Sequence, residues 1–382
     1  MGFSLCVIRK VVVGMKRFVS LLLVVVCLLG AVPNFAFAAG QHDISAESYI
    51  VTDDLGLEVF SCNADAKMPP ASTAKLLTAL VAAENCNLAS KIKVTNSHTA
   101  TEGSLMYLAV GETLTLEDLL YGLLLASGND AALCIAELVS GSTEDFVKLM
   151  NIKAAELGMD SSRFSNPSGL PDENCFTTAR DMVRLMAAFS KNEELMKISG
   201  TREAVLEKRT VVNHNRLISS VAGVDGGKTG YTKAAGRCLV TTAERNGRRF
   251  YVCTLNAPND WEDHKTLYEM SFGRLEKVEL GGFLPVSQDI VGGRERLCRV
   301  QCSEIPCLWL TKDETENLSS VTYMRRFEYA GVKMGEVCGR TDIFCGGKLV
   351  FSVPLYYAQS VAKLGGSENY LDKKLTAKEY SF

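Results

Sequence analysis

The hydrophobic pattern of this chain changes from strand-like to helical and back again. Alternating runs at residues 49–52 and 57–60 flank Asp54-Leu55-Gly56, which predicts a β-hairpin. From Leu76 to about Lys191 the apolar residues instead recur at helical spacing. The clearest predicted helices cover residues 116–125, 131–139, 143–157 and 179–189.

Strand-like runs return at residues 238–242 and 250–255. They face each other across Asn246-Gly247, one of the strongest short signals for a hairpin. Residues 265–272 predict a helix that closes this region. Strands at both ends with helices between them indicate an α+β fold, in which helices cover one antiparallel sheet. The first hairpin of that sheet would come from residues 48–62 and the rest from beyond residue 220.

From about residue 276 the pattern becomes a series of short strands with glycine-rich turns, including a hairpin across Gly346-Gly347. We therefore predict a small all-β domain over residues 276–364, after a main domain of residues 39–275. Its expected strands include residues 290–293, 308–310 and 321–327. Residues 365–382 form a polar tail without the continuous apolar face of a membrane-surface helix.

The N-terminus has the pattern of a secretory signal. Lys16 and Arg17 precede the apolar run 18–32, which is shorter than the roughly 20 residues of a membrane-spanning helix. Ala36-Phe37-Ala38 supplies a small-x-small cleavage site, so we expect a signal peptide of residues 1–38. An uncleaved anchor is the alternative. Either way the protein would work outside the cytoplasm, in the cell wall or on the outer face of the membrane, and peripheral membrane association stays open.

Composition and charge narrow the classes of function. The 382 residues suit two domains, and the net charge of −3 gives no electrostatic reason to expect nucleic acid as a partner. Two of the 13 cysteines lie in the signal, which leaves an odd number. Cys134, Cys238 and Cys253 lie in apolar runs, where a free cysteine behaves as a small buried hydrophobe. With only four histidines, none near the cysteines of residues 298–307, we expect no metal and no cofactor.

The most informative motif is Ser72-Thr73-Ala74-Lys75, which follows Pro69-Pro70 and starts a predicted buried helix. Residues three apart share a helix face, so the Lys75 amine can lie beside the Ser72 hydroxyl. Serine needs an adjacent base to become a nucleophile, and a desolvated lysine can be that base. Taken alone, the motif favours a helix cap with a solvated lysine one turn on. Ser90-Lys91-Ile92-Lys93 has the same form without a helical start.

Two further motifs follow in order. Ser127-Gly128-Asn129 lies between two predicted helices, where a short turn can present both polar side chains to a cleft; the alternative is an ordinary capping turn. Lys228-Thr229-Gly230 opens the second set of strands, where a strand edge can bind an extended peptide and Gly230 would allow close backbone approach. The alternative there is a solvated strand start. The three motifs in this order form a set that indicates one catalytic site.

From Glu47 into the β domain the chain resembles the low-molecular-mass penicillin-binding proteins, the serine D-alanyl-D-alanine carboxypeptidases of peptidase family S11. Besides the three motifs, the resemblance includes Gly103-Ser104-Leu105-Met106, Asn166-Pro167-Ser168-Gly169-Leu170, Thr178-Ala179-Arg180-Asp181 and the whole of Asp225 to Thr232. It implies a fold like that of β-lactamases and transpeptidases. It also implies an enzyme that removes the terminal D-alanine from peptidoglycan stem pentapeptides through an acyl-enzyme, with β-lactam antibiotics as covalent inhibitors.

The resemblance also implies a role for each site residue. Ser72 would be the acylated nucleophile and Lys75 its general base, while Ser127 would relay a proton to the leaving D-alanine and Asn129 would hold the peptide chain.

On the strand, Lys228 would supply positive potential and Thr229 would contact the terminal carboxylate. The backbone N–H groups of Ser72 and Tyr231 would form the oxyanion hole. Some relatives carry a carboxylate-binding arginine after the second hairpin, whereas residues 259–264 here read Asn-Asp-Trp-Glu-Asp-His. Arg237 or Lys228 is the available substitute.

Two other functions compete with this interpretation. A β-lactamase would need a deacylating glutamate, for which Glu173 is the nearest candidate, and the extra β domain argues against it. A non-catalytic cell-wall binding protein would have a degenerate site, whereas all three motifs are intact. His98, His214 and His264 are expected to be structural, because nothing in the sequence pairs them with a serine.

Overall fold

The computed structural model describes residues 44–364. The predicted signal peptide (1–38) and polar tail (365–382) lie outside the described residues. Within residues 44–364 no helix is long and apolar enough to cross a membrane.

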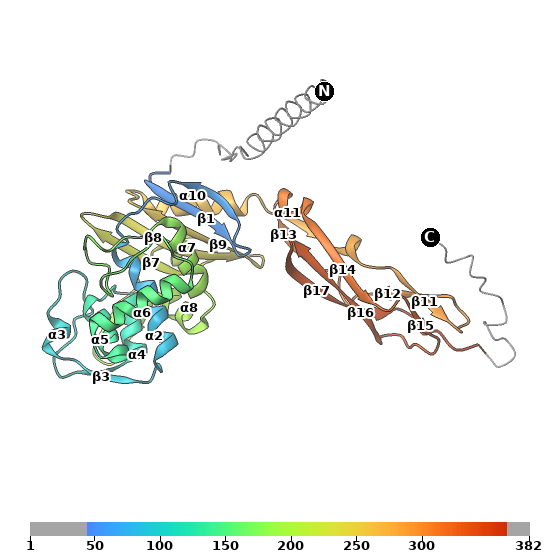
Figure 1. Ribbon diagram of the computed structural model, residues 1–382, viewed down its shortest axis with the longest axis horizontal. Helices are drawn as coiled ribbons and strands as arrows, with labels where there is room; N and C mark the ends of the chain where they lie inside the picture. Colours follow the sequence, from blue (N-terminus) through green and yellow to red (C-terminus); the bar gives the residue numbers. More distant parts are fainter. Residues whose placement is uncertain (1–43, 365–382) are drawn as a thin grey trace, which may run out of the picture. The chain divides into compact units, whose positions relative to one another are not determined.

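A five-stranded antiparallel sheet forms the centre of the first part of the chain. Its order is β2-β1-β9-β8-β7, and Figure 1 shows the N-terminal strands beside those of residues 224–255. The predicted origin of the sheet from two distant segments is therefore confirmed. The strands are β1 (Ser48–Asp53), β2 (Glu58–Cys62), β7 (Val224–Thr232), β8 (Gly236–Arg245) and β9 (Arg248–Leu255).

The turn between β8 and β9 has the geometry that its sequence predicts. Asn246 and Gly247 both have positive φ, 54° and 73°. Two successive positive φ values define the type I′ turn, whose twist matches that of the strands. The hairpin brings Arg245 opposite Arg248 and fixes the register of β8 on β9.

Alternating side chains of the sheet enter two separate cores. Val240 on β8 packs in one cluster with the helices that follow the Ser72 motif. Its neighbour Leu239 packs in another with Leu267 and Tyr268 of α10 (Asp260–Phe272). Because successive side chains of a strand point to opposite faces, the sheet lies between two helical layers. The predicted closing helix is confirmed, although it starts five residues earlier than the pattern indicates.

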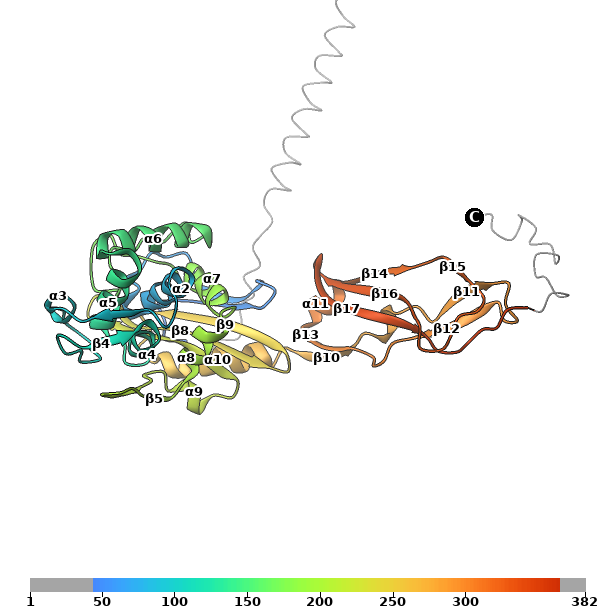
Figure 2. The ribbon, with the colours of Figure 1, turned by 90° about the horizontal axis from the view of Figure 1, so that it is seen from below.

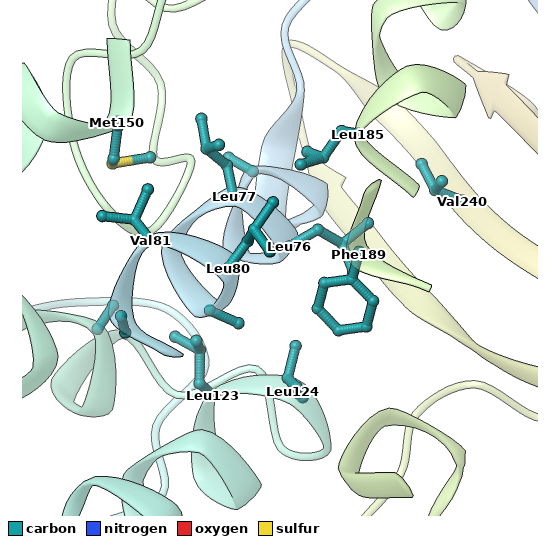
Figure 3. Packing of buried hydrophobic residues seen from close by; sticks show 14 of the residues in the cluster. Leu76, Leu77, Leu80, Val81, Leu123, Leu124, Met150, Leu185, Phe189 and Val240 are labelled. Carbon is teal, nitrogen blue, oxygen red and sulfur yellow. The ribbon is translucent and has the colours of Figure 1, made fainter. Parts of the chain in front are cut away.

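Helix α2 (Lys75–Asn85) is the innermost element of the first core. Leu76, Leu77 and Leu80 are buried, and Figure 3 shows them among side chains of α4, α6, α7 and β8. A helix that is apolar on all sides is stable only when other elements surround it. The Ser72 motif is therefore attached to the most enclosed helix of the fold.

The other predicted helices are confirmed to within two residues at each end. The sequence analysis did not predict α8, the short helices α3 and α9, or the two-stranded sheets β3-β4 and β5-β6. The remaining elements of this part are η1 (Ala71–Ala74), β3 (Lys91–Lys93), α3 (Asn96–Thr99), β4 (Thr113–Thr115), α4 (Leu116–Leu124), α5 (Asn129–Ser140), α6 (Thr143–Glu156), α7 (Ala179–Phe189), α8 (Glu193–Gly200), β5 (Glu203–Val205), β6 (Thr210–Val212) and α9 (Leu217–Ser220). Figure 2 shows α2, α6 and α7 on one side of the sheet and α10 on the other.

The C-terminal part is built of β-strands with its own small cores. A six-stranded sheet has the order β14-β16-β17-β12-β11-β15, and β10 pairs with β13. The elements are β10 (Glu276–Glu279), η2 (Gly281–Phe283), β11 (Ser287–Val291), β12 (Leu297–Gln301), β13 (Cys307–Leu310), α11 (Lys312–Glu316), β14 (Leu318–Met324), β15 (Phe327–Tyr329), β16 (Val337–Cys345) and β17 (Lys348–Tyr357). The hairpin across Gly346-Gly347 is confirmed. The division at residues 275 and 276 stays a prediction.

One predicted strand of this part is wrong. Residues 321–327 are not continuous, because β14 ends at Met324 and β15 starts at Phe327. The two pieces pair with different strands: β14 is antiparallel to β16, whereas β15 is parallel to β11. Pairing partners lie far away in the sequence, so the local pattern does not reveal the break.

The cysteines of residues 44–364 are all free thiols. Cys134, Cys238 and Cys253 are fully buried, which confirms that they act as small hydrophobes. Burial raises the pKa of the Cys238 thiol to about 11, so that thiol stays protonated and unreactive.

His264 is a buried structural residue, as expected. Its Nδ1 lies 2.8 Å from the Thr241 hydroxyl and its Nε2 lies 3.0 Å from the Thr254 hydroxyl. Burial lowers the pKa of the imidazole to about 3. The folded protein therefore holds His264 neutral between two strands of the sheet.

Replacing His264 should reduce the sensitivity of the fold to acid. The unfolded imidazole has a pKa of about 6.5, above the folded value of about 3. Between these values the unfolded state binds more protons, so stability falls as pH drops below 6.5, by up to about 1.4 kcal/mol per pH unit. Urea unfolding at pH 7 and pH 4.5 should show a smaller loss for His264→Gln than for the wild type. Equal losses would contradict this role.

Candidate active site

The backbone before Ser72 makes a sharp turn into α2. Ala71 has a positive φ of 48°. We expected Ser72 in the first turn of an α-helix, but it lies in the short 3-10 helix η1. Lys75 is instead the first residue of α2. The i to i+3 relation survives this difference, because a 3-10 turn also aligns residues three apart.

Gly169 holds the Ser72 turn from the other side. A Cβ at this position would lie 1.8 Å from the Ala71 carbonyl oxygen, so only glycine fits against that turn. The positive φ of Gly169, 76°, also suits glycine. The loop of residues 166–170 is thus packed directly on the backbone that presents Ser72.

The Lys75 amine is completely buried and lies within hydrogen-bond distance of three oxygens. Its Nζ is 2.9 Å from Ser72 Oγ, 2.7 Å from Asn129 Oδ1 and 2.7 Å from the Ser168 carbonyl oxygen. Burial, and then the nearby charge of Lys228, lower the pKa of Lys75 well below its ordinary value, against an opposing effect of Asp130. The solvated-lysine alternative is therefore wrong, because this amine has no contact with water.

The Ser127-Gly128-Asn129 turn joins α4 to α5. Ser127 has a φ of 61°, a left-handed conformation that is rare for a residue with a side chain. A Cβ at Gly128 would lie 2.8 Å from a carboxylate oxygen of Asp130, so this position requires glycine. Asn129 accepts a hydrogen bond from Lys75 and donates one of 2.6 Å to the Glu102 carbonyl oxygen. Strain of this kind concentrates at functional sites.

Asp130 is a site residue to which the sequence analysis gave no role. Its buried carboxylate accepts hydrogen bonds from the backbone N–H groups of Met106 and Leu108. These bonds fix the loop of residues 103–108 beside the turn. The position of Asp130 directly after Asn129 was the only available signal.

Strand β7 brings the third motif against the Ser72 turn. A Cβ at Gly230 would lie 3.0 Å from Ser72 N and 3.1 Å from the Ala71 Cβ, so the strand approaches closely where it has no side chain. The close approach is thus to the protein's own backbone. The Tyr231 side chain is 66% exposed, which leaves its backbone as the part next to the site.

Lys228 is a second buried lysine. It is 1% exposed, and its Nζ donates a hydrogen bond of 3.0 Å to the Thr229 carbonyl oxygen. Burial lowers its pKa to about 7. The pKa values of Lys75 and His214 are lowered by burial first and then by the charge of Lys228. The three motifs therefore meet: Ser72, Lys75 and Asn129 by hydrogen bonds, Gly230 by close packing and Lys228 by its electric field. Ser127 belongs to the same turn as Asn129, and Thr229 lies between Lys228 and Gly230 on β7.

Residues 259–264 lack the carboxylate-binding arginine of some relatives, and the nearby Arg237 is not free to replace it. Arg237 is engaged by Asp260, with Nη2 2.8 Å from a carboxylate oxygen, and its guanidinium lies over the Trp261 ring. His98 is also structural, because it caps α3 and lies 2.9 Å from Glu137. Among residues 44–364, no group of histidine, cysteine and acidic side chains could hold a metal ion.

Comparisons of the sequence and the structure with known proteins identify the family of this chain. The family of D-alanyl-D-alanine carboxypeptidases, peptidase family S11, matches residues 35–259. The D-alanyl-D-alanine carboxypeptidase DacF of Bacillus subtilis is 30% identical over 375 residues, which is 92% of this chain and 96% of that protein.

Two crystal structures are similar as well. A penicillin-binding protein homologue of Mycobacterium tuberculosis is 33% identical and has a TM-score of 0.60, covering 62% of this chain and 95% of its own. Penicillin-binding protein 5 of Haemophilus influenzae, 24% identical, has the same fold over 85% of this chain and all of its own, with a TM-score of 0.62. The chain therefore belongs to the S11 family of serine D-alanyl-D-alanine carboxypeptidases.

Proposed function

We propose that Ser72 is the nucleophile with which this carboxypeptidase removes the terminal D-alanine from peptidoglycan stem pentapeptides. The observation that carries the proposal is the fully buried Lys75 amine 2.9 Å from Ser72 Oγ. Burial lowers the pKa of Lys75 well below its ordinary value, which favours the neutral amine that a general base requires. Burying an amine costs free energy even when it is hydrogen-bonded, so a role for Lys75 in the chemistry accounts for a position that folding alone does not require.

Acylation would begin with transfer of the Ser72 proton to Lys75. The Ser72 oxygen then attacks the carbonyl carbon of the penultimate D-alanine, and the oxyanion is stabilised by the backbone N–H groups of Ser72 and Tyr231. Ser127 passes a proton to the nitrogen of the leaving D-alanine as the peptide bond breaks. Asn129 holds the peptide that remains attached to Ser72.

The terminal carboxylate would bind beside the second lysine. Protonated Lys228 supplies the positive charge and the Thr229 hydroxyl a hydrogen bond, as is usual for carboxylate recognition. Water then hydrolyses the ester, with Lys75 as base, and regenerates Ser72. A β-lactam would acylate the same serine, because its ring amide presents a carbonyl and a neighbouring carboxylate in place of the dipeptide.

We also propose that the enzyme works outside the cytoplasm, where its substrate lies. The support is the sequence pattern of residues 1–38. Peptidoglycan stem peptides and β-lactams are its proposed ligands, without nucleic acid, and peripheral association with the membrane is part of this proposal.

The β-lactamase alternative receives little support from the site. Glu173, the candidate deacylating residue, is exposed in the turn of residues 172–175. The oxygen that reaches Lys75 from this region is instead the Ser168 carbonyl, which is not a base. A non-catalytic scaffold would not need to keep two lysines buried at the site.

Loss of the Ser72 hydroxyl should abolish both reactions. We expect Ser72→Ala to release D-alanine from a pentapeptide at least about 10³-fold more slowly, because no acyl-enzyme can form. Fluorescent penicillin should no longer label the protein. Ser90→Ala in the similar tetrapeptide Ser90-Lys91-Ile92-Lys93 is the matched control and should behave as the wild type. Continued D-alanine release by Ser72→Ala would refute the proposal.

The two lysines should shape the pH dependence of kcat/KM, which reports the free enzyme. The rate should rise with pH as Lys75 loses its proton. It should fall above about pH 7, where Lys228 loses the charge that binds the carboxylate. In Lys228→Arg the upper limb should disappear, because arginine stays protonated. An upper limb that persists unchanged in Lys228→Arg would assign it to another group.

Gly230→Ala should impair acylation by steric means. The new Cβ would lie 3.0 Å from Ser72 N, so the strand or the turn must shift and disturb the oxyanion hole. Loss of one such donor lowers kcat by about 10²- to 10³-fold, which penicillin acylation kinetics would measure. Gly282→Ala is the control, since no atom lies within 4 Å of a Cβ there. Full activity of Gly230→Ala would contradict this packing argument.

A further inference from the structure

Strand β14 (Leu318–Met324) forms one edge of the six-stranded sheet. It pairs with β16 along its whole length, in seven consecutive residue pairs without a shift of register. Within residues 44–364 no strand pairs with its other side, and Figure 2 shows β14 at the margin of the C-terminal part. Every second residue of an edge strand directs its backbone N–H and C=O groups away from the neighbouring strand. The outer side of β14 therefore presents backbone donors and acceptors along a long, regular edge.

The sequence of β14 lacks the features that usually keep a strand edge from pairing. Protected edges are short, bulged or charged, or they contain proline. The residues Leu-Ser-Ser-Val-Thr-Tyr-Met include neither a charge nor a proline. By contrast, β15 at the other end of this sheet has three residues, one of which is Glu328. On β2, an edge of the first sheet, Glu58 is charged and the register with β1 shifts. Of these three edges, β14 is the one suited to pairing with a further strand.

The side chains of β14 are accessible although the strand is held firmly. Val321 and Tyr323 are two residues apart, so they lie on one face of the sheet, and they are 45% and 51% exposed. Arg340, directly opposite Tyr323 on β16, has its guanidinium 4.6 Å from the centre of the tyrosine ring. On the other face the Thr322 hydroxyl lies 2.9 Å from that of Thr341. The strand thus offers an apolar stripe that is already fixed in position.

The two ends of β14 carry opposite charges. Glu316 lies two residues before the strand and is exposed. Arg325 and Arg326 follow the strand and are also exposed, although Arg325 lies 2.8 Å from Glu328. An antiparallel strand of the same sequence would bring its basic end to the acidic end of β14, and its acidic end to the basic end. A parallel copy would instead place like charges together, which is destabilising. The charges therefore favour an antiparallel copy of β14 itself.

We propose that β14 pairs with β14 of a second copy of this chain and so forms a symmetric dimer. The two strands run antiparallel about a two-fold axis at Val321. Val321 then faces Val321 of the other copy, and Tyr323 of each copy faces Ser319 of the other. Cross-strand pairs of β-branched and aromatic residues stabilise a sheet. Because both copies use the same surface, the assembly closes at two copies and leaves neither β14 edge exposed.

The strength of this dimer follows from its size. One pair of seven-residue strands is small compared with the interfaces of permanent dimers, so the dimer should form and dissociate with protein concentration. Strand addition supplies backbone hydrogen bonds without a change of fold. Since β14 is already ordered on β16, little conformational entropy is lost when it pairs.

Sedimentation of the full-length chain at increasing protein concentration tests the pairing. We expect the wild type to change from monomer to dimer. Val321→Lys places two ammonium groups opposite each other at the two-fold axis and should raise the dissociation constant at least about fivefold. Leu349→Lys is the matched control, because Leu349 is an exposed residue of β17, which is not an edge strand. It should dimerise as the wild type does. Labelling by penicillin should be unchanged in both variants.

Exchange of the end charges tests the orientation and the identity of the partner. Glu316→Arg and Arg326→Glu should each weaken the dimer, because each brings like charges together at both ends of the paired strands. A chain with both substitutions should regain the wild-type dissociation constant, since each altered residue then meets an opposite charge in the other copy. Both residues lie outside the strand, so this test stands even if Val321→Lys disturbs the β domain.

Three results would overturn the inference. One is a wild type that stays monomeric up to its limit of solubility. Another is a dimer that neither Val321→Lys nor the single charge changes weaken, because association would then use another surface. The third is a doubly substituted chain that dimerises no better than the single variants, which would exclude the antiparallel pairing. All variants share the apolar run of residues 18–32, so any association through that run would be equal in each.

Discussion

The burial of the Lys75 amine is the constraint on which the rest of this structure depends. An amine taken out of water is tolerated only when hydrogen-bond partners surround it. Ser72, Asn129 and the Ser168 carbonyl supply those partners from three different segments of the chain. The two turns and the loop that carry them must therefore come together before the amine can be buried.

Steric fit supports this electrostatic requirement. Gly169 and Gly230 let a loop and a strand approach the Ser72 turn from two sides, closer than any side chain would permit. Lys228 on that strand then lowers the proton affinity of Lys75 without contacting it. The environment of Ser72, on which its proposed reactivity depends, is thus a property of three packed segments rather than of the four residues Ser72 to Lys75.

Much of the fold follows from local pattern, because period and turn chemistry are local properties. The Asn246-Gly247 hairpin and the helix over residues 179–189 are examples. The contact of Lys75 with Ser72 also follows from their spacing. By contrast, the Ser168 carbonyl reaches Lys75 across 93 residues of sequence, and no pattern near either residue indicates this contact. The left-handed backbone conformation of Ala71 and Ser127 could not be predicted either, since neither residue type favours it. The break between β14 and β15 depends on strand partners and was missed for the same reason.

Because α2 is enclosed by other elements, the geometry of the site depends on how the protein unfolds. Amides of a helix packed on all sides exchange with solvent mainly when a large part of the fold opens, whereas loops open locally at much smaller free energies. Leu76, Leu77 and Leu80 are buried at the centre of the larger core. The amides of α2 should therefore be among the slowest to exchange with deuterium. The geometry between Ser72 and Lys75 would then persist until cooperative unfolding and vanish in one step.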